Sequence, residues 1–147
     1  MTVMEVTQAE ADLLLAMRKF ATNNDIIELP DHGVRQIPLT SEDRRQQFTL
    51  DIRRAGLGLI KGTYQNRTRH IVVLARLDIG GAPHRNPDGK VISCPHLHLY
   101  REGFGDKWAI PIPNLFTRPN DMWQSLYDFM DFIKVVQKPN FQRGLFT

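Results

Sequence analysis

Hydrophobic residues recur at helical spacing near both ends of this chain, whereas from Val34 they recur at about every second position. A period of 3.6 residues is typical of a helix and a period of 2 is typical of a half-buried strand. The links between the predicted strands are short, and short links favour antiparallel pairing because parallel neighbours need long crossovers. The sequence therefore predicts an α+β fold, with a curved, mainly antiparallel sheet of about six strands flanked by an N-terminal and a C-terminal helix.

Each predicted helix has a start signal and an apolar stripe. Thr7 and Glu10 have the spacing of a capping box, and Asn23-Asn24 offers a stop for the first helix. Asn120 is the expected cap of the closing helix. The apolar stripe of the first helix consists of Leu13, Leu14, Met17 and Phe20, and that of the second consists of Trp123, Leu126, Tyr127, Met130 and Ile133. Among these, we expect Leu13, Met17, Trp123 and Met130 to be buried against the sheet.

The strands are predicted from alternation between the helices. Phe48, Leu50 and Ile52 alternate with polar residues, and Ala55-Gly56 is expected to turn the chain into a strand over residues 57–64. Residues 70–78 are apolar on both faces, as expected of an interior strand that carries His70 and Arg76 on one side. A loop over residues 80–89, closed by a turn at Pro87-Asp88-Gly89, precedes two further strands over residues 94–101 and 107–111.

The composition narrows the class of protein. With 147 residues the chain fits a single α+β domain over residues 1–147. The only cysteine is Cys94, so the sequence gives no sign of an oxidising compartment. No apolar run approaches the roughly 20 residues that a membrane span needs. We therefore expect a cytoplasmic protein that does not interact with a membrane.

Positive charge is concentrated in the middle of the chain. Residues 35–76 contain nine Lys or Arg residues against three Asp or Glu residues. Such a local excess attracts phosphate-rich partners through counterion release, although a solvated sheet face would have the same composition.

The segment CPHLHLYR, residues 94–101, carries the strongest functional signal. In a strand, His96, His98 and Tyr100 share one face, while Leu97 and Leu99 point the other way. His84 lies on the preceding loop, so a cluster of histidines on one surface is expected. Lys and Arg side chains bind phosphate through their positive charge and N–H donors. We expect six such residues near the strand ends to do so: Lys61, Arg67, Arg69, Arg85, Arg101 and Lys107.

The phrases YQNR, PHRNPDG and CPHLHLYREGFGDKWA, with an ending like QRGLF, resemble an uncharacterised family of small bacterial proteins that is catalogued as a domain of unknown function. The resemblance covers nearly the whole chain. It implies a bacterial source and assigns no activity to any residue.

One account of the histidine surface is a metal-independent endoribonuclease, such as the toxin of a toxin–antitoxin or defence system. RNA supplies its own 2′-hydroxyl nucleophile, so the protein needs an acid, a base and cations but no cofactor. His84 and His98 would form the acid/base pair, and Tyr100 would orient the phosphate. His96 would position the substrate or take the place of one member of the pair. The expected partners are RNA and an antitoxin or other protein.

Two other accounts remain open. His96, His98 and Glu102 have the H-x-H-x-x-x-E spacing of the first metal motif of cupin barrels, although no later histidine completes the second motif. The basic face could instead bind a nucleic acid or a protein without catalysis, as an accessory or anti-defence factor would.

Overall fold

The computed structural model describes residues 5–29, 32–55 and 61–143. Two helices and twelve strands occur within these residues. The helices are α1 (Gln8–Ala16) and α2 (Met122–Phe132). The strands are β1 (Lys19–Ala21), β2 (Ile26–Leu29), β3 (Gly33–Thr40), β4 (Gln47–Ala55), β5 (Lys61–Thr68), β6 (Val72–Ile79), β7 (His84–Arg85), β8 (Val91–Ile92), β9 (His96–Leu99), β10 (Ala109–Pro111), β11 (Val135–Gln137) and β12 (Asn140–Arg143).

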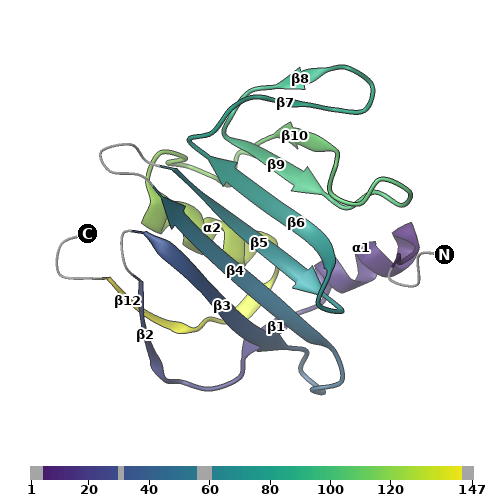
Figure 1. Cartoon of the computed structure of the whole chain (residues 1–147). Coiled ribbons are helices and arrows are strands. Elements are labelled where there is room, and N and C mark those ends of the chain that lie inside the picture. The colour runs from purple at the N-terminus through teal and green to yellow at the C-terminus, as the bar shows by residue number, and fades with distance from the viewer. Residues whose placement is uncertain (1–4, 30–31, 56–60, 144–147) are drawn as a thin grey trace.

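One large sheet organises these elements (Figure 1). Eight strands are hydrogen-bonded in the order β10-β9-β6-β5-β4-β3-β1-β11. All neighbours are antiparallel except β1 and β11, which are parallel, so the sheet is mixed. Strands β2 and β12 form a separate parallel pair, and β7 and β8 form a short hairpin. The α+β class is confirmed, but the sheet is larger than the predicted six strands because the three-residue strands β1 and β11 extend it at one edge.

Both helices pack on the same face of the sheet (Figure 1). In β4 the side chains of Phe48, Leu50 and Ile52 are buried on this face. They belong to one apolar cluster with Leu14 of α1 and Phe129 of α2. Strand alternation therefore places the core between the sheet and its two helices, and leaves the opposite face to polar residues.

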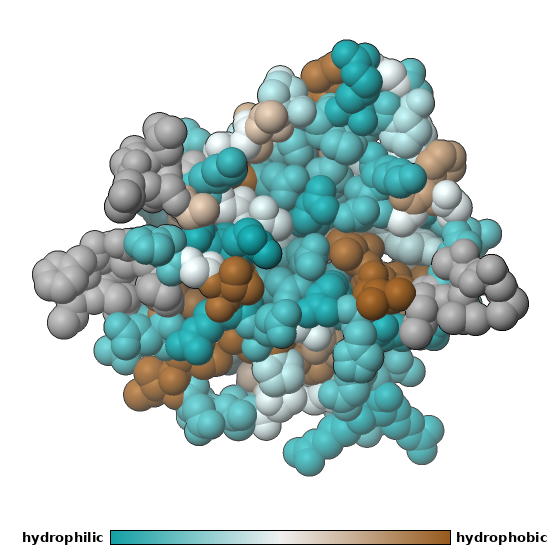
Figure 2. Space-filling model, viewed as in Figure 1, coloured by the Kyte–Doolittle hydropathy of each residue, from teal (hydrophilic) through white to brown (hydrophobic). Residues whose placement is uncertain are grey.

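The other face of the sheet is polar and open to solvent. Figure 2 looks onto this face, and hydrophilic side chains cover its centre. Strand β5 shows the alternation clearly, because Thr63 and Gln65 are half-buried on this face while Tyr64 is fully buried on the helix side. The described part of the chain contains no helix that is long and apolar enough to cross a membrane.

The first helix starts as predicted and ends earlier. Thr7 and Glu10 form the reciprocal capping box, but α1 stops at Ala16, well before Asn23-Asn24. Leu13 was expected in the core and is 66% exposed, whereas Leu14 is buried. The shorter helix puts Met17 at its C-cap and Phe20 in β1. The prediction that both residues belong to the apolar stripe of the first helix was therefore wrong.

The closing helix keeps its predicted stripe with one change at its start. The N-cap is Asp121, whose side chain accepts from the backbone N–H of Gln124, and not Asn120. Leu126 and Met130 are fully buried, while Trp123 is only half-buried.

A buried lysine joins the ends of the two helices. The Nζ atom of Lys19 donates to the carbonyls of Leu14, Leu15 and Met17 at 3.0 Å each, near the end of α1. Ile133 O, just after α2, lies 2.8 Å from the same atom, so the three N–H groups of the ammonium are shared among four carbonyls. Carbonyls at helix C-termini lack intrahelical partners and carry partial negative charge, so one side chain serves both helix ends, although burial lowers the pKa of Lys19 to about 7.

The interior strand over residues 70–78 is β6, which lies between β5 and β9. It begins at Val72 because Arg69 and His70 form a turn with positive φ angles of 52° and 66°. His70 therefore does not share a strand face with Arg76. The turn predicted at Ala55-Gly56 falls on residues 56–60, outside the described residues.

Candidate functional site

Strands β6 and β9 bring four polar side chains together on the open face of the sheet. Their antiparallel register pairs Arg76 with His98 and Asp78 with His96. Since side chains alternate along a strand, all four point to the same side. The two imidazoles are nevertheless almost completely covered, with 2% of His96 and 1% of His98 exposed.

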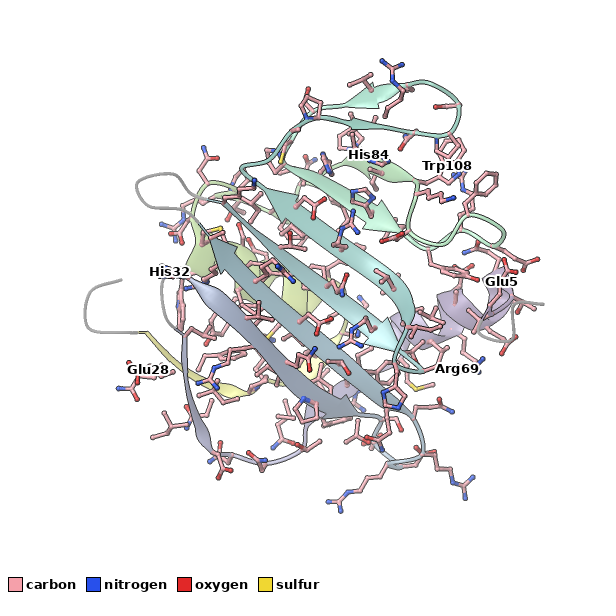
Figure 3. The ribbon with its side chains drawn as sticks, in the orientation of Figure 1. Glu5, Glu28, His32, Arg69, His84 and Trp108 are labelled. Carbon is pink, nitrogen blue, oxygen red and sulfur yellow. The ribbon has the colours of Figure 1, made fainter. Side chains whose placement is uncertain are left out.

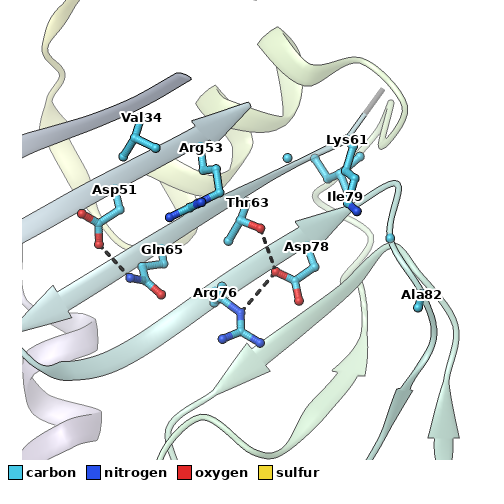
Figure 4. Close-up of a pocket in the computed structure, with 12 residues that line it drawn as sticks. Val34, Asp51, Arg53, Lys61, Thr63, Gln65, Arg76, Asp78, Ile79 and Ala82 are labelled. Carbon is cyan, nitrogen blue, oxygen red and sulfur yellow. Dashed lines mark hydrogen bonds and ion pairs between the residues drawn. The ribbon is translucent and has the colours of Figure 1, made fainter. Parts of the chain in front are cut away.

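The Asp78 carboxylate is the centre of this group. Its Oδ2 atom lies 3.2 Å from His96 Nε2 and 3.1 Å from His98 Nε2. Its Oδ1 atom accepts from Thr63 Oγ1 and from Arg76 Nε, both at 3.2 Å. Figure 4 shows Asp78 between Thr63 and Arg76. We call Asp78, His84, His96 and His98 the histidine cluster.

Backbone carbonyls hold the far side of each ring. His98 Nδ1 lies 2.8 Å from the carbonyl of Asp106, and His96 Nδ1 lies 3.3 Å from the carbonyl of Ser93. A carbonyl only accepts, so each Nδ1 donates to its carbonyl; Nε2 then carries the lone pair in the neutral ring and donates to Asp78 in the protonated ring. In either form the Nε2 atoms of both rings face Asp78.

The β7–β8 hairpin adds the third histidine. The ring of His84 lies edge-on to His98 at 4.5 Å between centroids and 5.9 Å from His96. Its Nε2 atom is 2.7 Å from Lys107 O, which assigns the proton to Nε2 and leaves Nδ1 basic. Unlike the other two rings, His84 is half-exposed. Three of the five histidines of the chain thus form one cluster.

Asn86 fixes this hairpin on the sheet edge. Its buried amide accepts from Ala109 N at 2.8 Å and donates to Ala109 O at 2.9 Å. The side chain thereby imitates a strand neighbour of β10 and sets the position of His84 two residues earlier.

The charges of the cluster follow from burial and pairing. Burial alone would raise the pKa of Asp78, but the hydrogen bond from the protonated His98 ring, and the charges of Arg76 and of protonated His98 and His96, outweigh it and lower that pKa to about 2. Burial lowers the pKa of His96, although Asp78 opposes this effect. At neutral pH, Asp78 is therefore an anion held between a guanidinium and two imidazoles.

A basic pocket of about 480 Å³ adjoins the cluster on the open face. Arg76 and Asp78 belong to both (Figure 4), and Arg53 and Lys61 supply further positive charge to its lining. Gly81 and Ala82 form part of the wall, and the chain continues from them to His84. Asp51 and Asp78 also line the pocket, but the three cations outnumber these two carboxylates, so the lining has a net positive charge.

Tyr100 and Glu102 do not join the histidine cluster. The Tyr100 hydroxyl accepts from Val6 N at 3.1 Å and donates to Val6 O, so it anchors the segment before α1. Strand β9 ends at Leu99, which is why alternation did not extend to Tyr100. Glu102 Oε1 accepts from Gln8 N at 2.7 Å, and Asp78 stands beside His96 and His98 in its place.

The predicted phosphate-binding residues are dispersed. Only Lys61 lines the basic pocket. Figure 3 shows Arg69 far from His84, and Arg69 pairs with Glu10 at 3.3 Å. The remaining side chains have other neighbours: Arg67 pairs with Asp51, Arg85 donates to Gly89 O, Arg101 stacks on Trp108, and Lys107 is exposed and contributes its carbonyl to His84.

Sequence reasoning missed Arg53, Thr63, Arg76 and Asp78. A signal was present, because Arg76 and Asp78 alternate with apolar residues in the interior strand. Residues 70–78 were predicted to be apolar on both faces, and only the register with β9 shows the relation of Arg76 and Asp78 to the histidines.

Three atoms of the cluster have the arrangement of a metal site. The ligand atoms of Asp78, His96 and His98 all lie within 4.8 Å of one another. Imidazole nitrogens and a carboxylate oxygen are common ligands of first-row divalent ions.

The model of a family of unknown function (DUF6978) matches residues 6–135, which include the cluster and the basic pocket. The chain belongs to this family. Neither the curated proteins nor the solved structures include a match to the chain.

Proposed function

We propose that this member of the DUF6978 family is an RNA-targeting endoribonuclease that cleaves through attack of the RNA 2′-hydroxyl. One observation carries the proposal: the half-exposed His84 packs on the buried His98–Asp78 pair at the edge of a basic pocket. A proton acceptor and an anion-binding surface thus lie side by side.

His84 is the proposed proton-transfer residue. The Nε2–H bond to Lys107 O fixes the ring and leaves Nδ1 to take the 2′-hydroxyl proton. The 5′-oxygen that leaves must gain a proton, and His84, protonated by the first transfer, has that proton to give. Only His84 is accessible enough to touch a substrate, since His96 and His98 are buried. The buried pair therefore acts as a positioning layer beneath it.

Cations on the open face are proposed to bind the phosphodiester. Arg53 and Lys61 are exposed and line the pocket. Arg76 lies between the pocket and the cluster, where its charge stabilises negative charge that develops on phosphate. The groups that RNA cleavage requires are thus all protein side chains.

Cleavage of RNA in the presence of a chelator tests the proposal. The expected products end in a 2′,3′-cyclic phosphate, and His84→Ala should lower the cleavage rate by about 10²–10⁴-fold while the protein stays folded. The matched control is His70→Asn, because His70 is an exposed histidine in a turn and Asn tolerates its positive φ. Equal rates in wild type and His84→Ala would exclude the proposed role.

A binding protein without catalysis is the second candidate, and the basic pocket favours it independently of the histidines. RNA retention by wild type and by His84→Ala, with intact RNA in both cases, would establish that reading. A protein partner such as an antitoxin or a defence component remains part of this proposal, in a bacterial cytoplasm.

A further inference from the structure

The Asp78 carboxylate and the two buried histidines converge on one point in space. We infer that Asp78, His96 and His98 form a binding site for a divalent cation of the Zn²⁺ class, and that the cation takes the place of a contact made by Arg76. The inference concerns binding alone and does not depend on RNA cleavage.

The distances within the site suit such an ion. An ion about 2.1 Å from each ligand keeps neighbouring ligand atoms about 3.0–3.4 Å apart in octahedral or tetrahedral geometry. The Asp78 Oδ2 atom is 3.2 Å from His96 Nε2 and 3.1 Å from His98 Nε2. The Asp78 oxygen is thus already at ligand spacing from each ring nitrogen, and the three ligand atoms lie within 4.8 Å of one another.

The rings are oriented as metal ligands usually are. Each Nδ1 donates to a backbone carbonyl, of Ser93 for His96 and of Asp106 for His98. This second contact fixes the tautomer and presents the Nε2 lone pair, as in most histidine metal sites. Two nitrogen lone pairs directed at a carboxylate repel it unless a positive charge lies between them. Nitrogen ligands favour Zn²⁺, Co²⁺, Ni²⁺ or Fe²⁺ over Mg²⁺ and Ca²⁺.

Access to the site is from the basic pocket. The side chains of His96 and His98 are 3% and 1% exposed, whereas that of Asp78 is 22% exposed and lines the pocket. Three protein ligands leave at least one coordination position open. That position lies on the Asp78 side, where a ligand in the pocket can reach it.

Arg76 supplies the positive charge in the arrangement described here. Its Nη2 atom is 3.1 Å from His98 Nε2, and its Nε donates to Asp78 Oδ1 at 3.2 Å. A cation on His98 Nε2 would repel this guanidinium, which keeps a second anchor because Nη1 donates to Asp106 at 2.6 Å. Removing the Arg76 charge should therefore strengthen metal binding, an outcome that damage to the fold would not produce.

Zn²⁺ titration of chelator-stripped protein against a chromophoric chelator tests the inference, with Co²⁺ absorption spectra as a second readout. His98→Gln and Asp78→Asn should each weaken Zn²⁺ binding by more than about 100-fold. Removing a metal ligand lowers the affinity more than removing a residue that only hydrogen-bonds to a ligand. Arg76→Gln should strengthen it by about 10-fold, which corresponds to removal of one nearby like charge.

Two controls complete the experiment. His70→Asn removes one exposed histidine outside the site, and Glu102→Gln tests the carboxylate that the sequence spacing suggested; both variants should bind Zn²⁺ as wild type does. Equal affinities in wild type, His98→Gln and Asp78→Asn would overturn the inference, as would weaker binding by Arg76→Gln. The readout needs no RNA, so an inactive but metal-binding protein would overturn only the proposed function.

Discussion

The guanidinium of Arg76 lies 3.1 Å from the Nε2 atom of His98, across the register pair that joins β6 to β9. The same guanidinium binds Asp78 and Asp106, so it connects both anions to the ring.

Substitution of Arg76 should be costly for the fold. Arg76→Gln leaves Asp78 and Asp106 without their shared cation, and we expect the free energy of unfolding to fall by about 1–3 kcal/mol because the pair is only partly buried. Urea denaturation measures this change. Arg53→Gln, an exposed arginine on the same face, should shift stability by less than about 0.5 kcal/mol; an equal loss in both variants would contradict the role of Arg76.

The Asn86 amide should control the position of His84. Asn86→Ala removes two buried hydrogen bonds to Ala109, which should lower stability by about 1–3 kcal/mol. Amide hydrogen exchange in β7 and β8 should accelerate, and RNA cleavage should fall because His84 is no longer held against His98. Lys90→Ala, an exposed change on the same hairpin, serves as the comparison; unchanged exchange in Asn86→Ala would disprove the anchoring role.

The hydroxyl of Tyr100 should matter for stability only. Tyr100→Phe loses two hydrogen bonds to Val6, and a loss of about 1–2 kcal/mol is expected in thermal or urea unfolding. Zn²⁺ affinity and the rate of RNA cleavage should stay at wild-type values. A large fall in the rate of RNA cleavage by the folded variant would contradict this prediction and indicate that Tyr100 takes part in cleavage.

RNA binding should depend on the pocket cations and not on every arginine. If Arg53 and Lys61 each contact one phosphate, the double change to Gln should reduce the slope of log affinity against log salt concentration by about 0.7 for each contact. Fluorescence anisotropy with single-stranded RNA at several salt concentrations measures the slope. Arg69→Gln should leave it unchanged, because Arg69 lies at the other end of the sheet beside Glu10.

Local patterns predicted the histidine face and missed its centre. The alternation of His96, Leu97 and His98 is a property of one strand, so it could be read from the sequence. The place of Asp78 depends on the register between β6 and β9, which no local pattern records. Glu102 was chosen for its spacing from His98, but a turn follows the strand and directs its side chain to α1.

In the fold, too, some features follow from local sequence and others depend on tertiary contacts. Capping at Thr7 and the interior position of β6 follow from local sequence, whereas β1 and β11 at one sheet edge depend on tertiary pairing of very short segments. Leu13 shows why periodicity alone misassigned the helix: the stripe that packs is set by the position of α1 on the sheet, and Ala11 and Leu14 face the core.

Lys19 makes the two ends of the chain interdependent. Its ammonium joins carbonyls at the end of α1 to Ile133 O, a residue 114 positions away. A shortened form of the protein that begins after Lys19 would keep all of α2 but would leave the carbonyl at its end without this donor. We therefore expect a deletion that removes Lys19 to weaken the end of α2 as well as to remove α1.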